Sequence, residues 1–357
     1  MKSVRIERIP ARIDDVRVVD VPRPEPAHGQ VRVRMRLAPV NPSDLNFVHG
    51  TYHDALARTL WNHGSGSADP RVFFDPAHMN PCPLPPYALG GEGVGVVDGC
   101  GGGLLARRLL GKRVAIAAGP PQGSWQEWTV VDARRAVVLP PSVADEQAAM
   151  FFVNPLTAFI LARKVLCVPR GDWLLVTAAG SALGGMMVRL GRRFGFRTRC
   201  VVRSAAGRAP LEALGADAVV TTDTQDLMTE VHRLTQGRGV GYAMDCVGGD
   251  LAGQVIRCLA PSGQLVVYGT LSNSPLPLMP RDLMMPSASI HGFLLPGWLA
   301  MHKPLVLLGV LRAVKALTVA GIFHADIAET FAIDDVQAAL TAATAAGRRG
   351  KVLLRLC

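Results

Sequence analysis

The chain has 357 residues, enough for two domains of ordinary size that each bury a core. Its formal net charge is +10, but only six of the 38 basic residues are lysine, and the arginines are scattered rather than clustered on one segment as in nucleic-acid-binding proteins. No apolar run reaches the roughly 18 uncharged residues of a membrane span, so we expect neither a nucleic-acid partner nor a membrane protein.

The first third of the chain has the pattern of a small, barrel-like β domain. Residues 1–8 alternate apolar and charged side chains, which predicts a first strand rather than a signal peptide, and we expect a cytoplasmic protein. Further strands, separated by Pro and Gly, are predicted over 30–37, 93–97, 113–117 and 128–131. Between Tyr52 and Gly90 the composition shifts to Gly, Pro, His and Asp, which predicts a long surface loop or lid.

The cysteines and histidines predict neither disulfides nor a metal site. The seven cysteines form an odd set without a Cys-x-x-Cys pair. The side chains that could suggest a metal site match no standard ligand spacing; they are His49, His53, His63, His78 and Cys82.

From about residue 145 the pattern changes to alternating helices and strands. Helices are predicted over 148–165, 184–195, 210–214 and 227–234, and strands over 173–177, 198–203, 218–221, 242–246 and 264–268. This alternation is typical of a doubly wound α/β domain with a parallel sheet. The segment from Ile290 is expected to return to the first domain and to end in a strand over 351–356.

A candidate phosphate-binding turn follows the strand over 173–177. The sequence Ala179-Gly180-Ser181-Ala182-Leu183-Gly184 leads into an apolar-periodic helix, whose N-terminal N–H groups and dipole would receive a pyrophosphate. Two of the three usual glycines are replaced, by Ala179 and Ser181, which are small enough for close backbone approach. Taken alone, the pattern also fits an ordinary strand-to-helix turn.

The end of the next strand favours the phosphorylated cofactor. A site for NAD places an acidic residue there, to hold the ribose 2′-hydroxyl. This chain has Arg203 and Ser204, with Arg208 shortly after. Because a guanidinium can pair bidentately with a phosphate, the sequence predicts NADPH rather than NADH; the alternative is a solvated arginine at a strand end.

A series of short motifs runs along nearly the whole chain. The motifs are Asn41-Pro42-Ser43-Asp44, Tyr52, Asn154-Pro155-Leu156-Thr157-Ala158, the turn at 179–184, Asp245-Cys246-Val247-Gly248-Gly249, Tyr268-Gly269-Thr270-Leu271, and His291-Gly292-Phe293-Leu294-Leu295 with Trp298. Their order and spacing resemble the zinc-independent branch of the medium-chain dehydrogenase/reductase superfamily, in particular its 2-enoyl thioester reductases, which act on enoyl-CoA or enoyl-acyl-carrier protein, and its quinone oxidoreductases. Zinc alcohol dehydrogenases of this superfamily have a cysteine at the position of Asn41 and a histidine at that of Gly91, before Glu92. The resemblance therefore implies hydride chemistry without a metal.

The resemblance also implies the domains and the catalytic residues. It implies a GroES-like catalytic domain over 1–150 and 291–357 and a Rossmann NADPH-binding domain over 151–290. Tyr52 is expected to hold the thioester oxygen or to supply the α-carbon proton, with Asn41 and Trp125 as further catalytic candidates. Alternatives remain: Tyr52 could pack under the following loop, Trp125 could serve only packing, and Glu92 is expected to make a structural hydrogen bond.

The cofactor residues are assigned by the same resemblance. Asn154 and Thr157 are expected to border the nicotinamide, and Arg203 with Ser204 to hold the 2′-phosphate. The remaining expected cofactor residues are Ala179, Gly180, Ser181, Ala182, Leu183 and Gly184 at the pyrophosphate, Arg208, Cys246, Gly269, Thr270, Phe293, Leu294, Leu295 and Lys351.

The predicted reaction is the NADPH-dependent reduction of an α,β-unsaturated thioester, or of a related enone or acid, by hydride transfer to the β-carbon. The expected carriers of the acyl group are CoA or acyl carrier protein, and the resemblance implies a homodimer. Two other functions stay open: an NADPH:quinone reductase, which does not require Tyr52, and a non-catalytic NADPH-binding protein.

Overall fold

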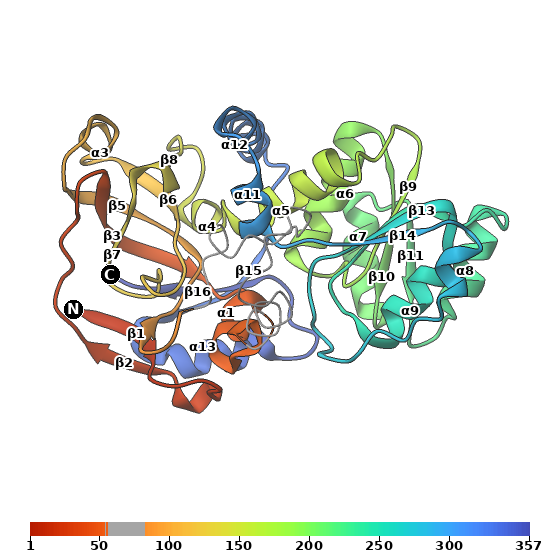
Figure 1. Cartoon of the computed structure of the whole chain (residues 1–357), viewed down its shortest axis with the longest axis horizontal. Coiled ribbons are helices and arrows are strands. Elements are labelled where there is room, and N and C mark those ends of the chain that lie inside the picture. Colours follow the sequence, from red (N-terminus) through yellow and green to blue (C-terminus); the bar gives the residue numbers. More distant parts are fainter. Residues whose placement is uncertain (54, 56–82) are drawn as a thin grey trace, which may run out of the picture. The chain divides into compact units, whose positions relative to one another are not determined.

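The computed structural model describes residues 1–53, 55 and 83–357, which form two compact units (Figure 1). Unit 1 comprises Met1–Val153, Leu299–His302 and Asp326–Cys357, and unit 2 comprises Asn154–Trp298 and Lys303–Ala325. Most of the predicted loop between Tyr52 and Gly90, with His63, His78 and Cys82, lies outside the described residues.

Unit 1 is built on a seven-stranded sheet with the order β15-β16-β3-β5-β6-β8, in which β7 also pairs with β3. The strands are β3 (Gln30–Pro39), β5 (Glu92–Cys100), β6 (Arg113–Ala117), β7 (Trp128–Asp132), β8 (Ala136–Val138), β15 (Ile327–Ala332) and β16 (Lys351–Arg355). All pairs are antiparallel except β15 with β16. The C-terminal strand β16, blue in Figure 1, thus lies beside the early strand β3, which brings residues from both ends of the sequence together.

A smaller sheet and several helices belong to the described part of unit 1. The sheet has the order β2-β1-β4, from β1 (Lys2–Ile6), β2 (Arg17–Asp20) and β4 (Tyr87–Ala88). The helices are α1 (Pro42–His49), α3 (Leu104–Leu109), α4 (Asp145–Ala149) and α13 (Val336–Thr344). The alternating side chains of Val31, Val33 and Met35 on β3 are fully buried in a core shared with Trp125 and Leu354. The β-rich prediction for this part of the chain is confirmed.

Unit 2 contains a six-stranded sheet that is parallel throughout, with the order β11-β10-β9-β12-β13-β14. The strands are β9 (Trp173–Val176), β10 (Arg197–Val202), β11 (Ala218–Thr221), β12 (Val240–Asp245), β13 (Leu259–Val267) and β14 (Ser289–Gly292). The chain runs outward from β9 through β10 to β11 and then returns to β12 on the other side of β9. This reversal is the topological switch point at which open α/β sheets bind ligands, and it confirms the doubly wound fold class.

Helices pack on both faces of this sheet. The helices that lie wholly or partly in unit 2 are α5 (Val153–Ile160), α6 (Ala182–Phe194), α7 (Arg208–Leu214), α8 (Leu227–Thr235), α9 (Gly249–Arg257), α10 (Arg281–Met284), α11 (Leu295–Met301), which ends in unit 1, and α12 (Pro304–Val319). Side chains of α8 and α9, such as Val231 and Val255, share a core with Val201 of β10. Because neighbouring strand residues point to opposite faces, Cys200 and Val202 face the other side, where α6 packs on β10. No helix of the described chain combines the length and apolar character that a membrane crossing requires.

Several boundaries differ from the sequence prediction, most of them by a few residues, and two of the differences are larger. The helix predicted over 148–165 is divided into α4, α5 and a π-helical turn at Leu161–Val165. The break between α4 and α5 is explained by Pro155, which lacks an N–H and whose ring would clash with the carbonyl of Phe151 in a continuous helix. The predicted return to the first domain at 291 is also displaced. Strand β14 pairs with β13, and Lys303–Ala325 belongs to unit 2, where Arg189 of α6 donates to the His324 carbonyl at 2.8 Å.

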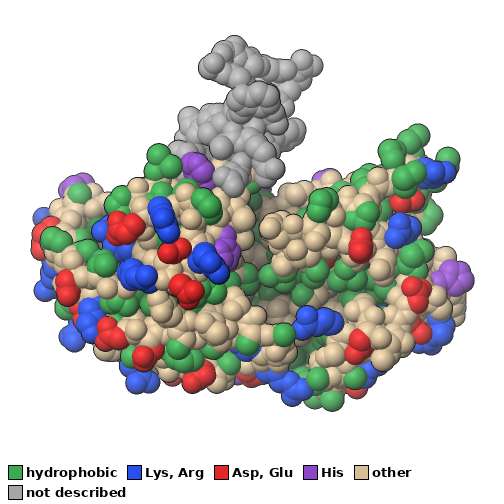
Figure 2. All heavy atoms as spheres, turned by 90° about the horizontal axis from the view of Figure 1, so that it is seen from below, with side chains coloured by type: hydrophobic (Ala, Val, Ile, Leu, Met, Phe, Trp, Pro, Cys, Tyr) green, Lys and Arg blue, Asp and Glu red, His purple; other side chains and the backbone are tan. Residues whose placement is uncertain are grey.

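Charged side chains of both signs are interspersed on the molecular face drawn in Figure 2. Several basic residues are neutralised locally, as in the pair of Arg32 with Asp98 at 2.9 Å and that of Arg36 with Asp145 at 3.0 Å. The described residues on this face therefore form no continuous basic patch of the kind that phosphate backbones require.

Candidate active site and cofactor site

Tyr52 lies just beyond α1 and is held by two residues of that helix. Its ring meets Phe47 edge to face, with 5.2 Å between centroids and 83° between planes, and its hydroxyl is hydrogen-bonded to Asn46. Burial raises the pKa of the phenol above its usual value of 10.0; the Asn46 contact lowers it and the nearby Asp44 raises it. The phenol is therefore protonated at neutral pH and can donate a hydrogen bond.

Asn46 was not predicted as a site residue. The hydrogen bond between Asn46 and Tyr52 follows from Gly50, which ends α1 in the left-handed conformation with a φ of 73° and reverses the chain direction. No sequence spacing signals such a contact, although the glycine itself marks the end of the helix.

Four polar residues of unit 1, here called the buried polar cluster, lie in the interior next to the start of α1. They are Asn41, Asp44, Glu92 and Lys351, which are all at most 5% exposed. The Asn41 amide donates to Glu92 Oε1 at 3.0 Å, and Lys351 Nζ donates to Asn41 Oδ1. Asp44 Oδ2 accepts the Asn41 backbone N–H at 2.8 Å. The cluster joins α1, β5 and β16 through hydrogen bonds.

Glu92 connects the cluster to the start of α5. Its Oε2 atom accepts the backbone N–H groups of Phe152 at 2.8 Å and Val153 at 2.9 Å. A carboxylate at this position satisfies N–H groups that have no partner within the helix and interacts favourably with the helix dipole. This is the structural hydrogen bonding expected of Glu92. Since α5 carries Asn154 and Thr157, the same contact fixes the beginning of that helix.

Burial dominates the ionisation of the cluster. It raises the pKa of Asp44 to about 7 and that of Glu92 above its usual value, and it lowers the pKa of Lys351 to about 8. The ammonium opposes these shifts in both carboxyls, and the carboxyls support the charge of Lys351. The cluster thus contains groups that exchange protons near neutral pH.

Asn41, Lys351 and Trp125 are placed as supporting rather than exposed groups. Both polar atoms of the Asn41 side chain are engaged within the cluster, one of them by Lys351. Trp125 is fully buried and donates its indole N–H to the Pro39 carbonyl at 3.1 Å. A Cβ atom at Gly90 would lie 2.3 Å from the Trp125 ring, so this tryptophan packs directly on the chain leading to Glu92. These placements favour positioning roles.

The described residues contain no group of three or more His, Cys, Asp or Glu side chains that could hold a metal ion. At the positions that hold zinc ligands in the alcohol dehydrogenases, Asn41 is bonded within the cluster and Gly91 has no side chain.

The expected cofactor residues of unit 2 gather along one edge of its sheet. They follow the carboxyl ends of β9 (179–184), β10 (Arg203 and Ser204), β12 (Cys246), β13 (Gly269 and Thr270) and β14 (Phe293, Leu294 and Leu295). Because all six strands are parallel, these ends lie at the same edge, where doubly wound sheets bind nucleotides. Asn154 and Thr157 come from α5; Asn154 is half-buried and Thr157 is 7% exposed.

The turn after β9 has the geometry of a phosphate cradle. Ser181 is the N-cap of α6, and its Oγ accepts the Gly184 N–H at 3.2 Å, which leaves the hydroxyl proton free to donate. A Cβ atom at Gly184 would lie 2.1 Å from the Ala179 carbonyl oxygen, so only glycine allows this close packing of helix on strand. Gly180 and Ser181 are exposed, and the helix N-terminus is accessible to an anion.

The ends of β12 and β13 approach each other closely. Asp245, fully buried, accepts the Thr177 hydroxyl at 2.6 Å and the Gly248 N–H at 2.7 Å. A Cβ atom at Gly269 would lie 2.8 Å from Cys246 Cβ, and burial raises the pKa of the Cys246 thiol to about 11. The Cys246 thiol is therefore uncharged and serves as a packing contact at the carboxyl edge of the sheet. The Thr177 hydroxyl, through its hydrogen bond to Asp245, helps to orient the end of β12.

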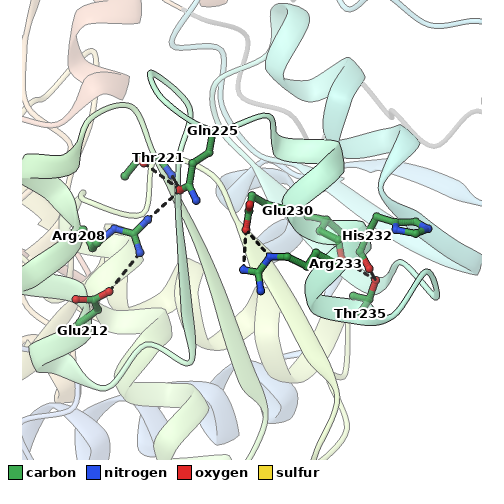
Figure 3. Close-up of polar contacts among 9 residues, drawn as sticks. Arg208, Glu212, Thr221, Gln225, Glu230, His232, Arg233 and Thr235 are labelled. Atoms are coloured by element: carbon green, nitrogen blue, oxygen red, sulfur yellow. Dashed lines mark hydrogen bonds and ion pairs between the residues drawn. The ribbon is translucent and has the colours of Figure 1, made fainter.

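The residues after β10 that are expected to bind phosphate differ in how far hydrogen bonds restrain their side chains. Arg203 and Ser204 are exposed. Arg208, the first residue of α7, is bound on two sides, by Glu212 Oε1 at 3.4 Å and by Gln225 Oε1 at 2.9 Å (Figure 3). Gln225 was not predicted as a site residue and belongs to no motif.

Comparisons with known proteins find similar sequences and structures for most of the chain. The family described as zinc-binding dehydrogenase matches residues 182–308. The mitochondrial enoyl-[acyl-carrier-protein] reductase of Schizosaccharomyces pombe is 29% identical over 80% of this chain and 75% of the relative. Prostaglandin reductase-3 of Bos taurus is 30% identical over 78% of this chain and 68% of the relative. The solved structure of a putative NADPH:quinone reductase from Bacillus thuringiensis is 29% identical, covers 100% of this chain and 99% of that one, and gives a TM-score of 0.84.

Proposed function

Because the chain belongs to the zinc-independent branch of the medium-chain dehydrogenase/reductase superfamily and is an oxidoreductase, we propose that it reduces a carbon–carbon double bond with NADPH. The proposed substrate is an α,β-unsaturated thioester or a related enone or acid. The observation that carries this proposal is Tyr52, a phenol whose pKa is raised by burial and whose hydroxyl is oriented by Asn46.

The carboxyl edge of the unit 2 sheet fits the proposed cofactor. Pyrophosphate would lie at the N-terminus of α6, in the cradle that Gly184 makes possible. The 2′-phosphate would meet Arg203, Ser204 and Arg208, where an NAD-specific site would have an acidic residue. Asn154 and Thr157, at the beginning of α5, are proposed to orient the nicotinamide.

Tyr52 is proposed to act where charge develops in the substrate. When bound, NADPH supplies a hydride to the β-carbon. The electron pair of the double bond then moves towards the carbonyl, and a donor aimed at that oxygen lowers the barrier. Tyr52 can donate this hydrogen bond, or it can transfer its proton to the α-carbon and regain one from water. The balance is complete: the substrate gains a hydride and a proton, and the cofactor is oxidised.

The proposal for the carrier of the substrate rests on relatives rather than on a contact in this chain. The relative from Schizosaccharomyces pombe is an enoyl-[acyl-carrier-protein] reductase, which supports an acyl chain on acyl carrier protein or on CoA. The relative from Bos taurus is named prostaglandin reductase-3, and the proposal therefore also includes enones without such a carrier. The substrate panel of any assay therefore includes both kinds of molecule.

The test is NADPH oxidation by purified, chelator-treated protein with trans-2-enoyl thioesters of increasing length and with small enones. Tyr52→Phe is expected to lower kcat by about 100-fold, because it removes the donor and keeps the ring that packs on Phe47. Tyr242→Phe, on β12, is the matched control and should keep full activity. Turnover that is indifferent to Tyr52→Phe would contradict the proposed mechanism.

A quinone reductase is the second candidate, because the similar Bacillus thuringiensis structure is that of a putative NADPH:quinone reductase. Quinones accept a hydride without a protein proton donor at the α-carbon, so Tyr52→Phe should retain quinone activity. Turnover of quinones but of no enone or thioester would favour this candidate. Tight NADPH binding without turnover of either class would instead indicate a non-catalytic cofactor-binding protein.

A further inference from the structure

The side-chain oxygen of Gln225 is the centre of a small polar network at the carboxyl edge of the unit 2 sheet. It accepts the backbone N–H of Thr221 at 2.9 Å, the Thr221 hydroxyl at 3.0 Å and Arg208 Nη2 at 2.9 Å (Figure 3). Thr221 is the last residue of β11 and is 3% exposed. Gln225 is thereby anchored to the end of a buried strand, and it presents a fixed acceptor to Arg208.

The loop that carries Gln225 is joined to the residues after β10. Beyond the last register pair, Val202 with Thr221, the Thr222 N–H donates to the Val202 carbonyl and the Asp223 N–H to the Arg203 carbonyl, both at 3.0 Å. The loop after β11 and the segment that begins at Arg203 therefore continue side by side beyond the sheet.

Arg208 has donors left for a further ligand. A guanidinium carries five N–H groups in a planar fork. Gln225 and Glu212 engage one nitrogen each, Nη2 and Nη1, and these contacts fix the plane of the fork. The Glu212 contact alone is a weak restraint, since it is 3.4 Å long and half-exposed. An unrestrained arginine has about 2 kcal/mol of rotamer entropy to lose on binding.

We propose that Gln225 is a positioning residue that determines cofactor specificity, because it holds the Arg208 guanidinium in place for the 2′-phosphate. This rests on the proposed NADPH dependence and deepens it: Arg208 contacts the phosphate, and Gln225 acts through Arg208 without touching the cofactor. Preference for NADPH therefore depends on the loop after β11 as well as on the residues after β10.

The test measures the dissociation constants of NADPH and NADH, and of adenosine 2′,5′-bisphosphate against AMP, on the full chain by calorimetry. Gln225→Met removes the acceptor at nearly constant size. It should weaken the two 2′-phosphorylated ligands by roughly five- to tenfold, the size expected for losing the orientation of one charged contact, and leave NADH and AMP unchanged.

A double-mutant cycle separates positioning from a general structural effect. Arg208→Met should weaken NADPH more than Gln225→Met does, and the double variant should match Arg208→Met alone, because Gln225 acts only through that side chain. Arg233→Met is the matched control: this arginine also pairs with a carboxylate, Glu230 at 2.8 Å (Figure 3), but it lies in the last turn of α8, at the end of the helix remote from the loop that carries Gln225. Its loss should leave both cofactors unaffected.

Failure of the inference and failure of the proposed cofactor look different. If the unmodified chain prefers NADPH but Gln225→Met weakens both cofactors equally, or adds independently to Arg208→Met, the positioning role is overturned. If the unmodified chain shows no preference, or Arg203→Glu weakens NADH as much as NADPH, the cofactor proposal falls and the inference with it. Should Gln225→Met not fold, Thr221→Val removes one of the three hydrogen bonds to Gln225 and must show a smaller loss in the same, NADPH-selective sense.

Discussion

Replacement of Asp44 by asparagine should change how stability depends on pH. Burial raises the pKa of this carboxyl from 3.8 to about 7, with Glu92 also raising it and Lys351 and two backbone N–H groups opposing. Since the folded pKa lies above the unfolded one, the folded chain binds the proton more tightly between those values. The stability that this proton contributes is present below about pH 4 and is lost as the pH rises through 7. Asparagine does not titrate, so the variant escapes this loss.

The size of the effect follows from the two pKa values. A difference of about 3 units, at about 1.4 kcal/mol each, gives an upper value of about 4 kcal/mol for the change in relative stability between acid and neutral pH. Asparagine has one acceptor oxygen, whereas Asp44 accepts N–H groups of both Asn41 and Gly91. Losing one of these bonds costs about 1–3 kcal/mol at every pH. The variant should therefore be the less stable protein at pH 4.5, and equal or more stable at pH 7.5.

Urea unfolding of both proteins at pH 4.5, 6.0 and 7.5 measures this difference. The constant loss of a hydrogen bond cancels when the relative free energy of unfolding is compared across pH. Asp132→Asn is the control, because Arg134 lowers the pKa of Asp132 to about 2 and that group does not titrate in this window. A relative stability of Asp44→Asn that moves by less than about 1 kcal/mol from pH 4.5 to 7.5 would refute an ionising, buried Asp44.

Two further stability changes follow from buried cations. Lys351→Met leaves the carboxyls of Asp44 and Glu92 buried without their cation, and it should lower the free energy of unfolding at pH 7 by about 3–5 kcal/mol in urea titrations; a loss under about 1 kcal/mol would contradict this. Arg199 of β10 is fully buried, and its guanidinium nitrogens have no hydrogen-bond partner among the described residues. The guanidinium lies over the Trp173 ring, 4.3 Å from its centroid, and burial lowers the pKa of Arg199 to about 10. Arg199→Met should leave the Tm unchanged or raise it in calorimetry, since an uncompensated buried charge is removed, whereas a fall of more than about 5 °C would argue for an unrecognised partner.

Much of the fold could be predicted from the sequence because the signals for its helices, strands and turns are local. The strands predicted over 113–117 and 218–221 agree with β6 and β11 to the residue. The glycine of the turn at 179–184 has the packing role that its motif predicts. The position of α12 was not readable, because a helix with so many apolar side chains can be buried against either domain and its periodicity does not name the neighbour. Pro155, by contrast, is a local signal in the sequence that a continuous helix over 148–165 is broken.

The site was only partly readable because its decisive contacts are distant in sequence. Lys351 meets Asn41 across 310 positions, and Glu92 meets the start of α5 across 60. The family resemblance implies roles for Asn41 and Lys351 individually, but no spacing in the sequence shows that they bond to each other. Gln225 lies in a polar loop of ordinary composition, and its importance appears only when β10 and β11 are paired. Contacts of this kind depend on strand register, which the hydrophobic pattern of a two-sided buried sheet specifies weakly.

The charges of the buried polar cluster explain why Tyr52 is the donor to test. With every group ionised, the carboxylates of Asp44 and Glu92 outnumber the single ammonium of Lys351, so one proton near neutral pH makes the buried set electrically neutral. The ammonium and the Asn41 amide are then committed to each other and to Glu92. The phenol of Tyr52 lies outside this chain of hydrogen bonds; its contact is with Asn46, and its raised pKa keeps the proton on the phenol at neutral pH. Loss of that phenol should therefore lower kcat more than it raises KM, because charge on the substrate oxygen develops in the transition state and not in the bound substrate.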